Sequence, residues 1–352
     1  MRVLVAMSGG VDSSVAAARM VAEGHEVIGV TLKLWAGPNG EMPTAGCCTV
    51  SDSEDARRVA SQLDIPYYVL DYTEDFSHGV IDGFVADYLS GRTPNPCVEC
   101  NRTVKFSRLL SQAGDFDCDL VATGHYARVD HHGGRFRLRR GVDVLKDQSY
   151  VLSMLGQDQL AKVRFPVGDI EKLEVRRIAS DLGLRTAEKA ESMDICFVGQ
   201  RDYRTFLRSH APAALQPGAV VTTDGREVGA HDGIADFTVG QRRGLGVALG
   251  EPHYVVDVDA PTATVTIGTR SHLFSSGIRI ARATWTDTPL QPREATLVQY
   301  RAHGEAVEGV WDGNDELRFA TPQPALAPGQ TAAFYRDDEV VGGGIIERAW
   351  PA

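Results

Sequence analysis

A short polar loop between an expected strand and an expected helix limits the folds open to this chain more than any other segment. It reads Ser8-Gly9-Gly10-Val11-Asp12-Ser13-Ser14 and follows the apolar run Val3–Met7. Glycines let the backbone approach an anion, consecutive N–H groups form an anion-binding nest, and the following helix N-terminus adds partial positive charge. The serines can donate hydrogen bonds, and Asp12 can reach a magnesium ion carried by the phosphates. The segment therefore predicts a phosphate-binding loop.

Two common phosphate-binding fingerprints do not match this loop. The Lys-Ser/Thr pair of the P-loop is absent, and Gly9-Gly10 lacks the G-x-G-x-x-G spacing of dinucleotide-binding folds. The heptapeptide instead resembles the pyrophosphate loop of the ATP-pyrophosphatase superfamily. That resemblance implies that ATP adenylates a carbonyl oxygen, that pyrophosphate is released, and that a nucleophile displaces AMP. An ordinary glycine turn between a strand and a helix is the alternative interpretation.

The length and composition predict a soluble globular protein of two or three domains. The chain has 352 residues, of which 43% are hydrophobic and 24% are charged. No apolar stretch is long enough to cross a bilayer, no signal peptide precedes the first expected strand, and six cysteines are too few for a disulfide scaffold. We therefore expect a cytoplasmic protein in a reducing compartment, with no membrane partner. Because the net charge is −11, any nucleic-acid surface must concentrate its Lys and Arg side chains locally.

Strands and helices alternate in the N-terminal part of the chain, which predicts a doubly wound parallel sheet with helices on both faces. The expected strands cover 2–7, 27–35, 67–70 and 120–123, and the expected helices cover 13–23, 51–63, 74–89 and 105–112. Ser51 and Glu54 have the spacing of a capping box for the second helix. Ligands of such sheets bind beyond the carboxyl ends of the strands, where the glycine loop and Gly124-His125 both fall.

The pattern changes to short strands after the stretch 211–217, which is typical of a linker. Short strands at 219–221, 227–230, 253–258 and 264–267 predict a small β-rich unit. The chain from 278 onward is all β and predicts a small barrel, with strands at 278–286, 294–300, 307–311, 316–319, 331–335 and 340–347. We therefore expect an α/β protein with an ATP-pyrophosphatase-type (adenine nucleotide alpha hydrolase-like) catalytic domain over 1–208, a central β-rich domain over 209–272 and a C-terminal β-barrel over 273–352.

Three cysteines are the candidate reactive groups. Cys97 and Cys100 lie in the proline-flanked loop Asn95-Pro96-Cys97-Val98-Glu99-Cys100, and C-x-x-C spacing occurs in redox pairs, zinc sites and iron–sulfur sites. Arg102 and Lys105 follow closely and favour the thiolate form of Cys100. Two buried structural cysteines are the alternative interpretation. Cys196, between apolar neighbours, would on its own be interpreted as a buried structural cysteine.

An ordered set of segments resembles the bacterial tRNA-specific 2-thiouridylases, and the match covers essentially the whole chain. The segments are Ser8–Ser14, Gly91–Phe106, Ala122–Arg128, Lys146–Tyr150, Ile195–Phe197, Gly240–Gly246, Gly329-Gln330 and Phe334-Tyr335. The resemblance implies a tRNA-uridine 2-sulfurtransferase that uses ATP and Mg²⁺ to adenylate the C2 oxygen of the wobble uridine (position 34) in tRNAs for Lys, Glu and Gln, releasing AMP and pyrophosphate. It also implies two partners: the anticodon stem-loop, and a sulfur-relay protein or cysteine desulfurase.

The same resemblance implies roles for individual residues. Cys196 resembles the family's persulfide carrier, and Cys100 its second catalytic thiol, so that a Cys100–Cys196 disulfide is left for reduction after each turnover. Nucleotide binding is implied for Ala6, Met7, Ser8, Gly9, Gly10, Val11, Asp12, Ser13, Leu32 and Gly124. Contacts with tRNA or the target base are implied for Asn95, Pro96, Cys97, His125, Lys146, Asp147, Gln148, Tyr300, Arg301 and Gln330. The central domain becomes a tRNA-binding domain, in which Arg242-Arg243 is a candidate phosphate clamp. Sheet core is the alternative interpretation of Leu32.

Cys97 departs from the family pattern, in which many members have Asp at this position. Either the acid/base role of that Asp is dispensable, or Glu99 or water supplies it, or Cys97 has a different role. One such role is to ligate, with Cys100 and Cys196, a [4Fe–4S] cluster with one open iron, which would make the chain a cluster-dependent tRNA thiolase. Another ATP-pyrophosphatase-type ligase is the second alternative, and the thiols argue against it because amide formation needs none.

Overall fold

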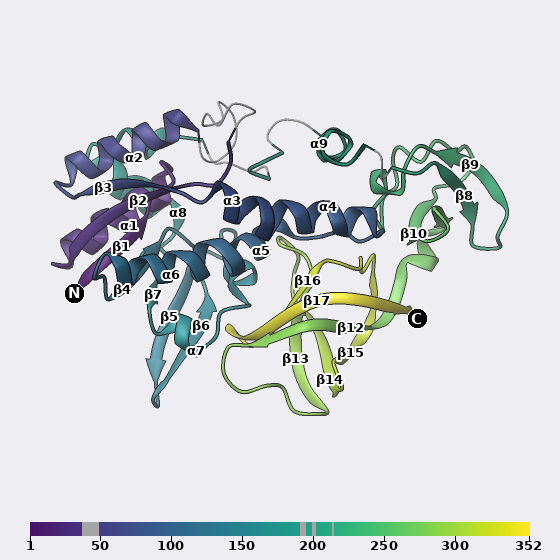
Figure 1. The fold of residues 1–352 in the computed structure, drawn as a ribbon. Coiled ribbons are helices and arrows are strands. Elements are labelled where there is room, and N and C mark those ends of the chain that lie inside the picture. The colour runs from purple at the N-terminus through teal and green to yellow at the C-terminus, as the bar shows by residue number, and fades with distance from the viewer. Residues whose placement is uncertain (37–48, 191–194, 199–201, 213–214) are drawn as a thin grey trace.

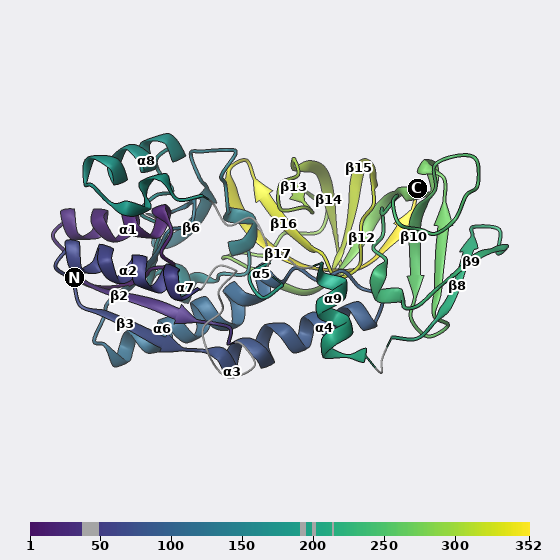
Figure 2. The ribbon, with the colours of Figure 1, turned by 90° about the horizontal axis from the view of Figure 1, so that it is seen from above.

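The computed structural model is an elongated molecule with the N-terminal domain at one end and the C-terminal strands beside and beyond it (Figures 1 and 2). It describes residues 1–36, 49–190, 195–198, 202–212 and 215–352. The described chain forms a 5-stranded, a 4-stranded and an 8-stranded sheet. In both views the barrel lies between the N-terminal domain and the 4-stranded unit.

The 5-stranded sheet is entirely parallel and has the order β3-β2-β1-β4-β7. Its strands are β1 (Arg2–Ala6), β2 (Glu26–Lys33), β3 (Tyr67–Asp71), β4 (Leu120–Thr123) and β7 (Val163–Arg164). One face packs against α1 (Val11–Ala22), α2 (Val50–Gln62) and α8 (Lys172–Asp181), and the other against α4 (Asp82–Leu89) and α6 (Phe106–Asp115). The prediction of a doubly wound parallel sheet is therefore confirmed.

The start of α2 differs from the sequence prediction. Its capping box is formed by Thr49 and Asp52, where Ser51 and Glu54 had been expected. The Thr49 hydroxyl accepts a hydrogen bond from the Asp52 backbone N–H at 3.1 Å, and the Asp52 carboxylate accepts one from the Thr49 N–H at 2.9 Å. Because both pairs have the same three-residue spacing, sequence spacing alone does not distinguish them.

Two π-helical stretches interrupt the helices on the second face. The helix expected over 74–89 consists of α3 (Thr73–Phe76), a π-helical turn (Ser77–Ile81) and α4. Another π-helical stretch, Cys100–Lys105, links the short α5 (Pro96–Glu99) to α6. π-Bulges occur frequently at functional sites, and the second one begins at a predicted catalytic cysteine.

The 4-stranded sheet forms a small unit with its own core. Its order is β10-β11-β8-β9, with β8 (Gly218–Thr222), β9 (Glu227–His231), β10 (Tyr254–Asp259) and β11 (Thr264–Gly268). Its buried core includes Val220, Val255, Val265 and Ile267. The helix α9 (Tyr203–His210) precedes the unit, and Phe206 of α9 packs on the core of the N-terminal domain. Part of the expected linker, residues 213–214, lies outside the described residues.

The C-terminal strands form the expected barrel. They are β12 (Phe274–Trp285), β13 (Glu294–Gln299), β14 (Val307–Gly313), β15 (Glu316–Pro324), β16 (Thr331–Arg336) and β17 (Glu339–Pro351). They follow the order β12-β15-β14-β13-β16-β17, and pairing between β12 and β17 closes the barrel. The confirmed fold is thus a parallel-sheet domain, a small β-rich domain and a β-barrel; the exact domain boundaries given above stay a prediction.

A β-hairpin that the sequence did not lead us to expect joins the barrel to the N-terminal domain. Its strands are β5 (Ala127–His132) and β6 (Arg135–Arg140), and β6 pairs with β17, where Val340 lies opposite Leu138. One buried cluster contains side chains from both units: Val98, Phe106, Leu138, Ala333, Tyr335 and Val340. The two units therefore share a core.

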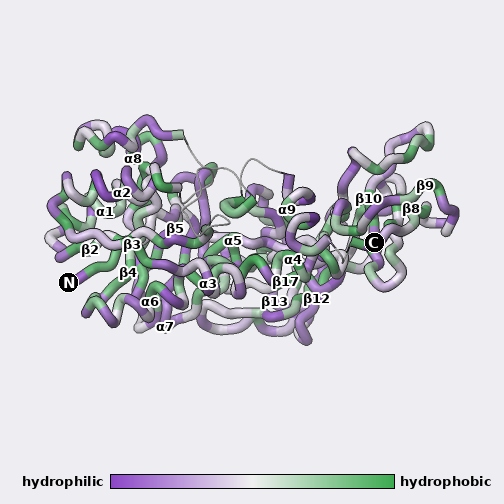
Figure 3. Tube along the Cα trace, turned by 45° about the horizontal axis from the view of Figure 1, so that its top comes forward, coloured by the Kyte–Doolittle hydropathy of each residue, from purple (hydrophilic) through white to green (hydrophobic). Residues whose placement is uncertain are grey.

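Hydrophobic and hydrophilic segments alternate along the coloured part of the trace (Figure 3). Within the described parts of the chain, no helix is both long and apolar enough to cross a membrane.

Candidate active site

The predicted phosphate loop folds tightly on itself between β1 and α1. The Ser13 hydroxyl accepts a hydrogen bond from the Ser8 N–H and donates one to the Gly10 carbonyl, both at 3.1 Å. Gly9 has a φ of +71°, and a Cβ atom there would lie 2.1 Å from the Asp52 carbonyl oxygen. Only glycine fits this position, since both the backbone angle and the space exclude a side chain. The loop opens directly into the N-terminus of α1, as an anion site requires.

Gly124, at the end of β4, closes against this loop. A Cβ atom at Gly124 would lie 2.7 Å from the Ser13 backbone nitrogen. The side chains of Met7 and Val11 are buried, so these two residues can present only backbone atoms to a nucleotide. The structure thus brings the loop residues and Gly124 together. Leu32 is 7% exposed and belongs to the sheet core, which favours the core interpretation; its contact with adenine stays a prediction.

Asp12 has two partners that sequence reasoning missed. The Lys172 ammonium donates to its two carboxylate oxygens at 2.7 and 2.8 Å, and the Tyr126 hydroxyl donates to it at 2.6 Å. Tyr126 lies two residues after Gly124, but no motif marks Lys172. The hard carboxylate oxygens of Asp12 fit Mg²⁺, which is usually bound through one or two carboxylates together with substrate phosphates.

Lys189 also reaches the phosphate loop. Its ammonium donates to the Gly9 carbonyl at 3.0 Å and to the carboxylates of Asp52 and Asp55, both at 2.7 Å. Burial lowers the pKa of Lys189, but the hydrogen bonds to the two carboxylates outweigh burial and raise the pKa overall. Lys189 therefore carries its positive charge next to the predicted phosphate site, and no sequence motif marks it.

The cysteine loop forms the short helix α5, whose start Asn95 caps. The Asn95 side-chain oxygen accepts hydrogen bonds from the backbone N–H groups of Cys97 at 3.2 Å and Val98 at 3.4 Å. Pro96 occupies the first helical turn, where its missing N–H costs nothing. The Cys97 residue is exposed, whereas Cys100 is 5% exposed. Figure 1 shows α5 in the middle of the molecule, next to α6.

Cys100 and Cys196 pack against the same core cluster. Cys100 is a buried member of that cluster, and the half-buried Cys196 packs against it. Phe197 anchors the Cys196 segment, because its ring centroid lies 5.1 Å from the ring centroid of Phe84 and 5.6 Å from that of Phe76. The neighbouring residues 191–194 and 199–201 lie outside the described residues.

Two of the alternatives raised for Cys97 concern groups that the structure describes, and both stay hypotheses. Among the described residues, which include Cys97, Cys100 and Cys196, no three Cys, His, Asp or Glu side chains gather in an arrangement that could hold a metal ion. The Glu99 carboxylate, the other acid/base candidate, pairs with Arg282 at 3.3 Å and with Arg102 at 3.8 Å.

His125 lies beside Gly124 with its ring against aromatic neighbours. Its Nδ1 is 2.7 Å from the Thr123 hydroxyl, and its ring centroid is 5.8 Å from that of Phe106 and 6.0 Å from that of Phe165. Burial, with a smaller contribution from the Lys105 charge, lowers the pKa of His125 to about 3. The ring is therefore a neutral imidazole near pH 7, suited to stacking and hydrogen bonding.

The predicted tRNA-contacting loop 146–148 is well ordered by its own hydrogen bonds. The Asp147 carboxylate accepts hydrogen bonds from Arg140, the Gly141 N–H, and both the N–H and the hydroxyl of Ser149. The Gln148 side chain accepts one from the Tyr126 N–H at 3.0 Å, which ties the loop to the strand end that carries His125. Lys146 is partly exposed.

The predicted barrel residues fall into two places. The Tyr300 hydroxyl donates to Gln323 at 3.2 Å, and the exposed Arg301 guanidinium lies 5.4 Å from the Tyr300 ring centroid. Gln330 lies elsewhere, because its side-chain amide donates to the Thr93 carbonyl at 2.8 Å, just before the cysteine loop. The structure therefore brings Gln330 to the candidate active-site loop.

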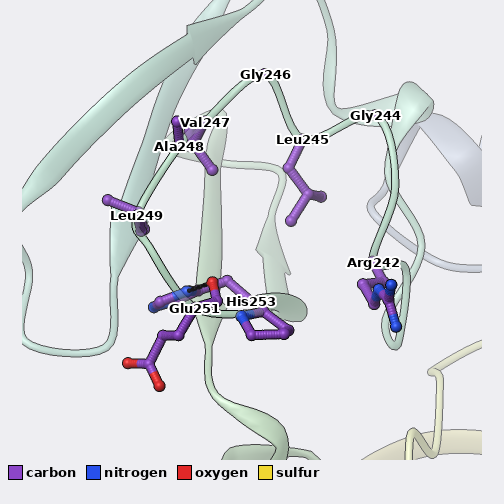
Figure 4. Close-up of a pocket in the computed structure, with 10 residues that line it drawn as sticks. Arg242, Gly244, Leu245, Gly246, Val247, Ala248, Leu249, Glu251 and His253 are labelled. Carbon is purple, nitrogen blue, oxygen red and sulfur yellow. Dashed lines mark hydrogen bonds between the residues drawn. The ribbon is translucent and has the colours of Figure 1, made fainter.

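Arg242, the first of the two arginines between glycines, lines a hollow of about 500 Å³ in the central domain (Figure 4). Arg242 and the glycine-rich segment Gly244–Gly246 line it, together with Glu251 and His253. Arg242 and Arg243 are both exposed, and neither forms an ion pair with any residue that the structure describes.

Sequence comparisons place each of the three domains in a known class. Residues 1–200 match the family model described as tRNA methyl transferase HUP domain, residues 204–269 match the tRNA methyl transferase PRC-barrel domain, and residues 275–346 match the aminomethyltransferase beta-barrel domain. The fold and the loop thus define a HUP-type nucleotide-binding domain, a fold that fits ATP use, followed by two β domains.

Curated relatives match over nearly the full length. The chain is 46% identical to the tRNA-specific 2-thiouridylase MnmA of Roseiflexus castenholzii, covering 99% of each chain. It is 48% identical to the protein of the same name from Acidothermus cellulolyticus, covering 99% of this chain and 98% of the relative. The chain belongs to the tRNA-specific 2-thiouridylase family, so the resemblance seen in the sequence is confirmed.

Solved structures match more distantly. NMN synthetase from Francisella tularensis is 18% identical, with 58% of this chain and 71% of that chain covered and a TM-score of 0.33. A 4-thiouridine synthetase in complex with RNA and bound ATP is 15% identical, with 60% and 51% covered and a TM-score of 0.36. Likenesses this distant add nothing to the functional argument.

Proposed function

We propose that this chain transfers sulfur to C2 of the wobble uridine in tRNAs for Lys, Glu and Gln, with ATP as the activating substrate and AMP and pyrophosphate as products. One observation carries the proposal. Cys100 and Cys196 are distant in the sequence, yet both pack against one core cluster of the domain whose sheet ends in the phosphate loop. Family membership and relatives named as tRNA-specific 2-thiouridylases support the choice of substrate.

The phosphate loop supplies what adenylation needs. Backbone N–H groups of the loop and the N-terminus of α1 bind the triphosphate, and the positive charges of Lys172 and Lys189 lie within hydrogen-bonding distance of Asp12 and the Gly9 carbonyl. Asp12 is the residue that would hold Mg²⁺, which neutralises charge on the phosphates when bound. The uridine C2 oxygen displaces pyrophosphate from ATP, so a poor leaving oxygen becomes part of AMP.

Sulfur transfer then uses two thiols. A sulfur-relay protein or cysteine desulfurase charges Cys196 as a persulfide. The terminal sulfur attacks C2 and AMP leaves with the former C2 oxygen. The Cys100 thiolate attacks the Cys196 sulfur, the persulfide S–S bond breaks, and its electron pair stays with the sulfur now on C2. A Cys100–Cys196 disulfide remains, and a two-electron thiol reductant restores both thiols.

The target base must leave the anticodon stack before this chemistry, at a modest cost because the loop is single-stranded. We assign base contacts to Asn95, Pro96, Cys97 and the neutral His125 ring. Contacts with the phosphate backbone of the tRNA are assigned to Lys146, Gln148, Arg301, Arg243 and Arg242, of which Arg242 lines the hollow in Figure 4, since guanidinium groups bind phosphate oxygens bidentately.

Nucleoside analysis tests the proposal. The purified protein is incubated with ATP, Mg²⁺, a cysteine desulfurase, L-cysteine, a thiol reductant and an unmodified tRNA-Glu transcript, and both pyrophosphate release and 2-thiouridine are measured. We expect both products with this transcript and neither with a matched transcript carrying cytidine at position 34. Thiolation at another position, or pyrophosphate release that does not depend on tRNA, would overturn the proposal.

A further inference from the structure

The loop before the cysteine helix is held by a turn of the C-terminal barrel. The Thr93 N–H donates to the Pro328 carbonyl at 2.7 Å, and the Gln330 side-chain amide donates to the Thr93 carbonyl at 2.8 Å. Thr93 and Gln330 are 237 positions apart in the sequence. Both backbone polar groups of Thr93 therefore bind this one turn, which we call the barrel turn (residues 327–331).

The barrel turn has a fixed shape that receives the Thr93 backbone. Gly329 has a φ of +93°, and a Cβ atom there would lie 2.8 Å from the Thr93 nitrogen and 2.9 Å from its carbonyl oxygen. Two hydrogen bonds hold the barrel turn against β17. The Gly329 N–H donates to the Ile346 carbonyl, and the Ile346 N–H donates to the Gln330 carbonyl, both at 2.8 Å. The close approach to Thr93 therefore depends on a glycine at 329.

Two further contacts tie α5 to the barrel. The buried Tyr150 hydroxyl donates to the Thr331 carbonyl at 2.9 Å, and the side chain of Asn95, which caps α5, is close enough to Tyr150 to lower its pKa against the effect of burial. At the other end of α5, the Glu99 carboxylate pairs with Arg282 of β12 at 3.3 Å. The helix is only four residues long, and such a short helix takes its orientation from outside contacts because it is unstable alone.

We propose that Gln330 and Gly329 are positioning residues for sulfur transfer. The barrel turn holds the Thr93 backbone, and Thr93 in turn sets the place of the helix that carries Cys97 and leads to Cys100. The role given to Cys100 rests on the proposed function above, but the mechanical link does not. Loss of the link would expose Cys100 and lower the yield of sulfur transfer, while adenylation at the phosphate loop continues.

Alkylation of the thiols tests the link without any enzyme assay. Wild type, Gln330→Ala and Gly329→Ala are pulsed with iodoacetamide, and the modified fraction of each cysteine is measured by peptide mass spectrometry. We expect the Cys100 rate to rise about two- to tenfold, the range that corresponds to one lost hydrogen bond, while exposed Cys97 reacts as in wild type. Unchanged Cys100 rates in both variants would overturn the proposal.

Two matched variants control for general damage to the barrel. Gln291→Ala removes another side-chain amide that donates to a backbone carbonyl, that of Pro289 at 3.1 Å. Gly313→Ala places a side chain at another barrel glycine with positive φ, +83°. We expect Cys100 to react in both variants at the wild-type rate; an equal rise in these variants would show loosening of the barrel and overturn the specific link.

A second readout separates positioning from RNA binding. We expect Gln330→Ala to lower the amount of 2-thiouridine formed per pyrophosphate released about two- to tenfold, with an unchanged Kd for tRNA. A weaker Kd with an unchanged ratio would make Gln330 a tRNA contact only and overturn the proposal. If the wild type forms no 2-thiouridine at all, the proposed function fails, and the alkylation rates still decide whether the barrel turn positions Cys100.

Discussion

His125 illustrates how the surroundings of one side chain set its chemistry. The ring lies against Phe106 and Phe165, and burial together with the Lys105 charge lowers its pKa to about 3. An unfolded histidine has a pKa near 6.5. The unfolded chain therefore binds a proton that the folded chain does not, and the stability linked to His125 is lost as the pH falls from above 6.5 towards 3.

This linkage predicts a measurable pH dependence of stability. Between about pH 7.5 and pH 5.5, the free energy of unfolding of the wild type should fall by about 1 kcal/mol more than that of His125→Gln, which has no titrating group. Urea unfolding at both pH values measures the difference. Equal pH dependence in the two proteins would show that folding does not lower the pKa of His125.

The loop between β1 and α1 was predictable because its chemistry is local. Its glycines and serines are contiguous, and the apolar run before them marks a strand, so the loop and its place in the fold follow from a few adjacent residues. The partners of Asp12 were not predictable, because Lys172 and Tyr126 reach it across the fold. A lysine without a motif gives no signal in a single sequence.

Gly124 offers a test of the loop that leaves its own residues unchanged. In Gly124→Ala the new methyl group would lie 2.7 Å from the Ser13 nitrogen and displace the loop from β4. We expect the KM for ATP in tRNA-dependent pyrophosphate release to rise by about tenfold or more, equivalent to about 1.4 kcal/mol of lost binding. Gly114→Ala is the matched control because nothing lies within 4 Å of its Cβ position. A wild-type KM in Gly124→Ala would count against the loop as the ATP site.

The β5–β6 hairpin was missed although a turn signal was present. Gly133 and Gly134 both have positive φ, +61° and +77°, and a Gly-Gly pair between two strands is a hairpin signature. The strands are rich in Arg and His, and their alternating apolar positions are only Ala127 and Val129 in β5 and Phe136 and Leu138 in β6. Their burial depends on β17, a partner far along the chain, so composition alone could not place them.

The molecule as a whole is less modular than its three domains indicate. The cluster around Leu138 joins residues of the N-terminal domain to residues of β16 and β17, whereas the central unit has a core of its own. The helix α5, which carries Cys97, lies at that shared core through Val98. We infer that the barrel and the N-terminal domain unfold together.

A core substitution tests this cooperativity. Leu138 is fully buried, and Leu138→Ala should lower the free energy of unfolding by about 2–5 kcal/mol. Hydrogen-exchange mass spectrometry should show faster exchange in both the β1–β4 sheet and the barrel strands. Val265→Ala, in the central core, is the control and should affect mainly β8–β11. Faster exchange confined to one of the two units in Leu138→Ala would refute a shared cooperative unit.

The acidic net charge requires that tRNA binding depend on local basic groups. Replacing Arg242 and Arg243 together by Ala should weaken tRNA binding. The negative slope of log K, the association constant, against log salt concentration should become shallower by about 1 to 2. Filter binding at several salt concentrations measures the slope. Arg177→Ala removes an exposed arginine that is paired with Glu174 and Asp181 and should leave the slope unchanged. An unchanged slope in the double variant would remove this hollow from the tRNA surface.

One variant tests whether adenylation at the ATP site is separate from sulfur transfer by the thiols. Cys196→Ser is assayed with tRNA-Glu, ATP, a cysteine desulfurase and L-cysteine, with Cys118→Ser as the control, because Cys118 packs at the edge of the core. Free sulfide is left out because it would bypass the persulfide.

We expect Cys196→Ser to release pyrophosphate at close to the wild-type rate in a tRNA-dependent first turnover and to form no 2-thiouridine. Loss of both activities in a folded Cys196→Ser protein would make Cys196 structural, and wild-type levels of 2-thiouridine would exclude it as the sulfur carrier.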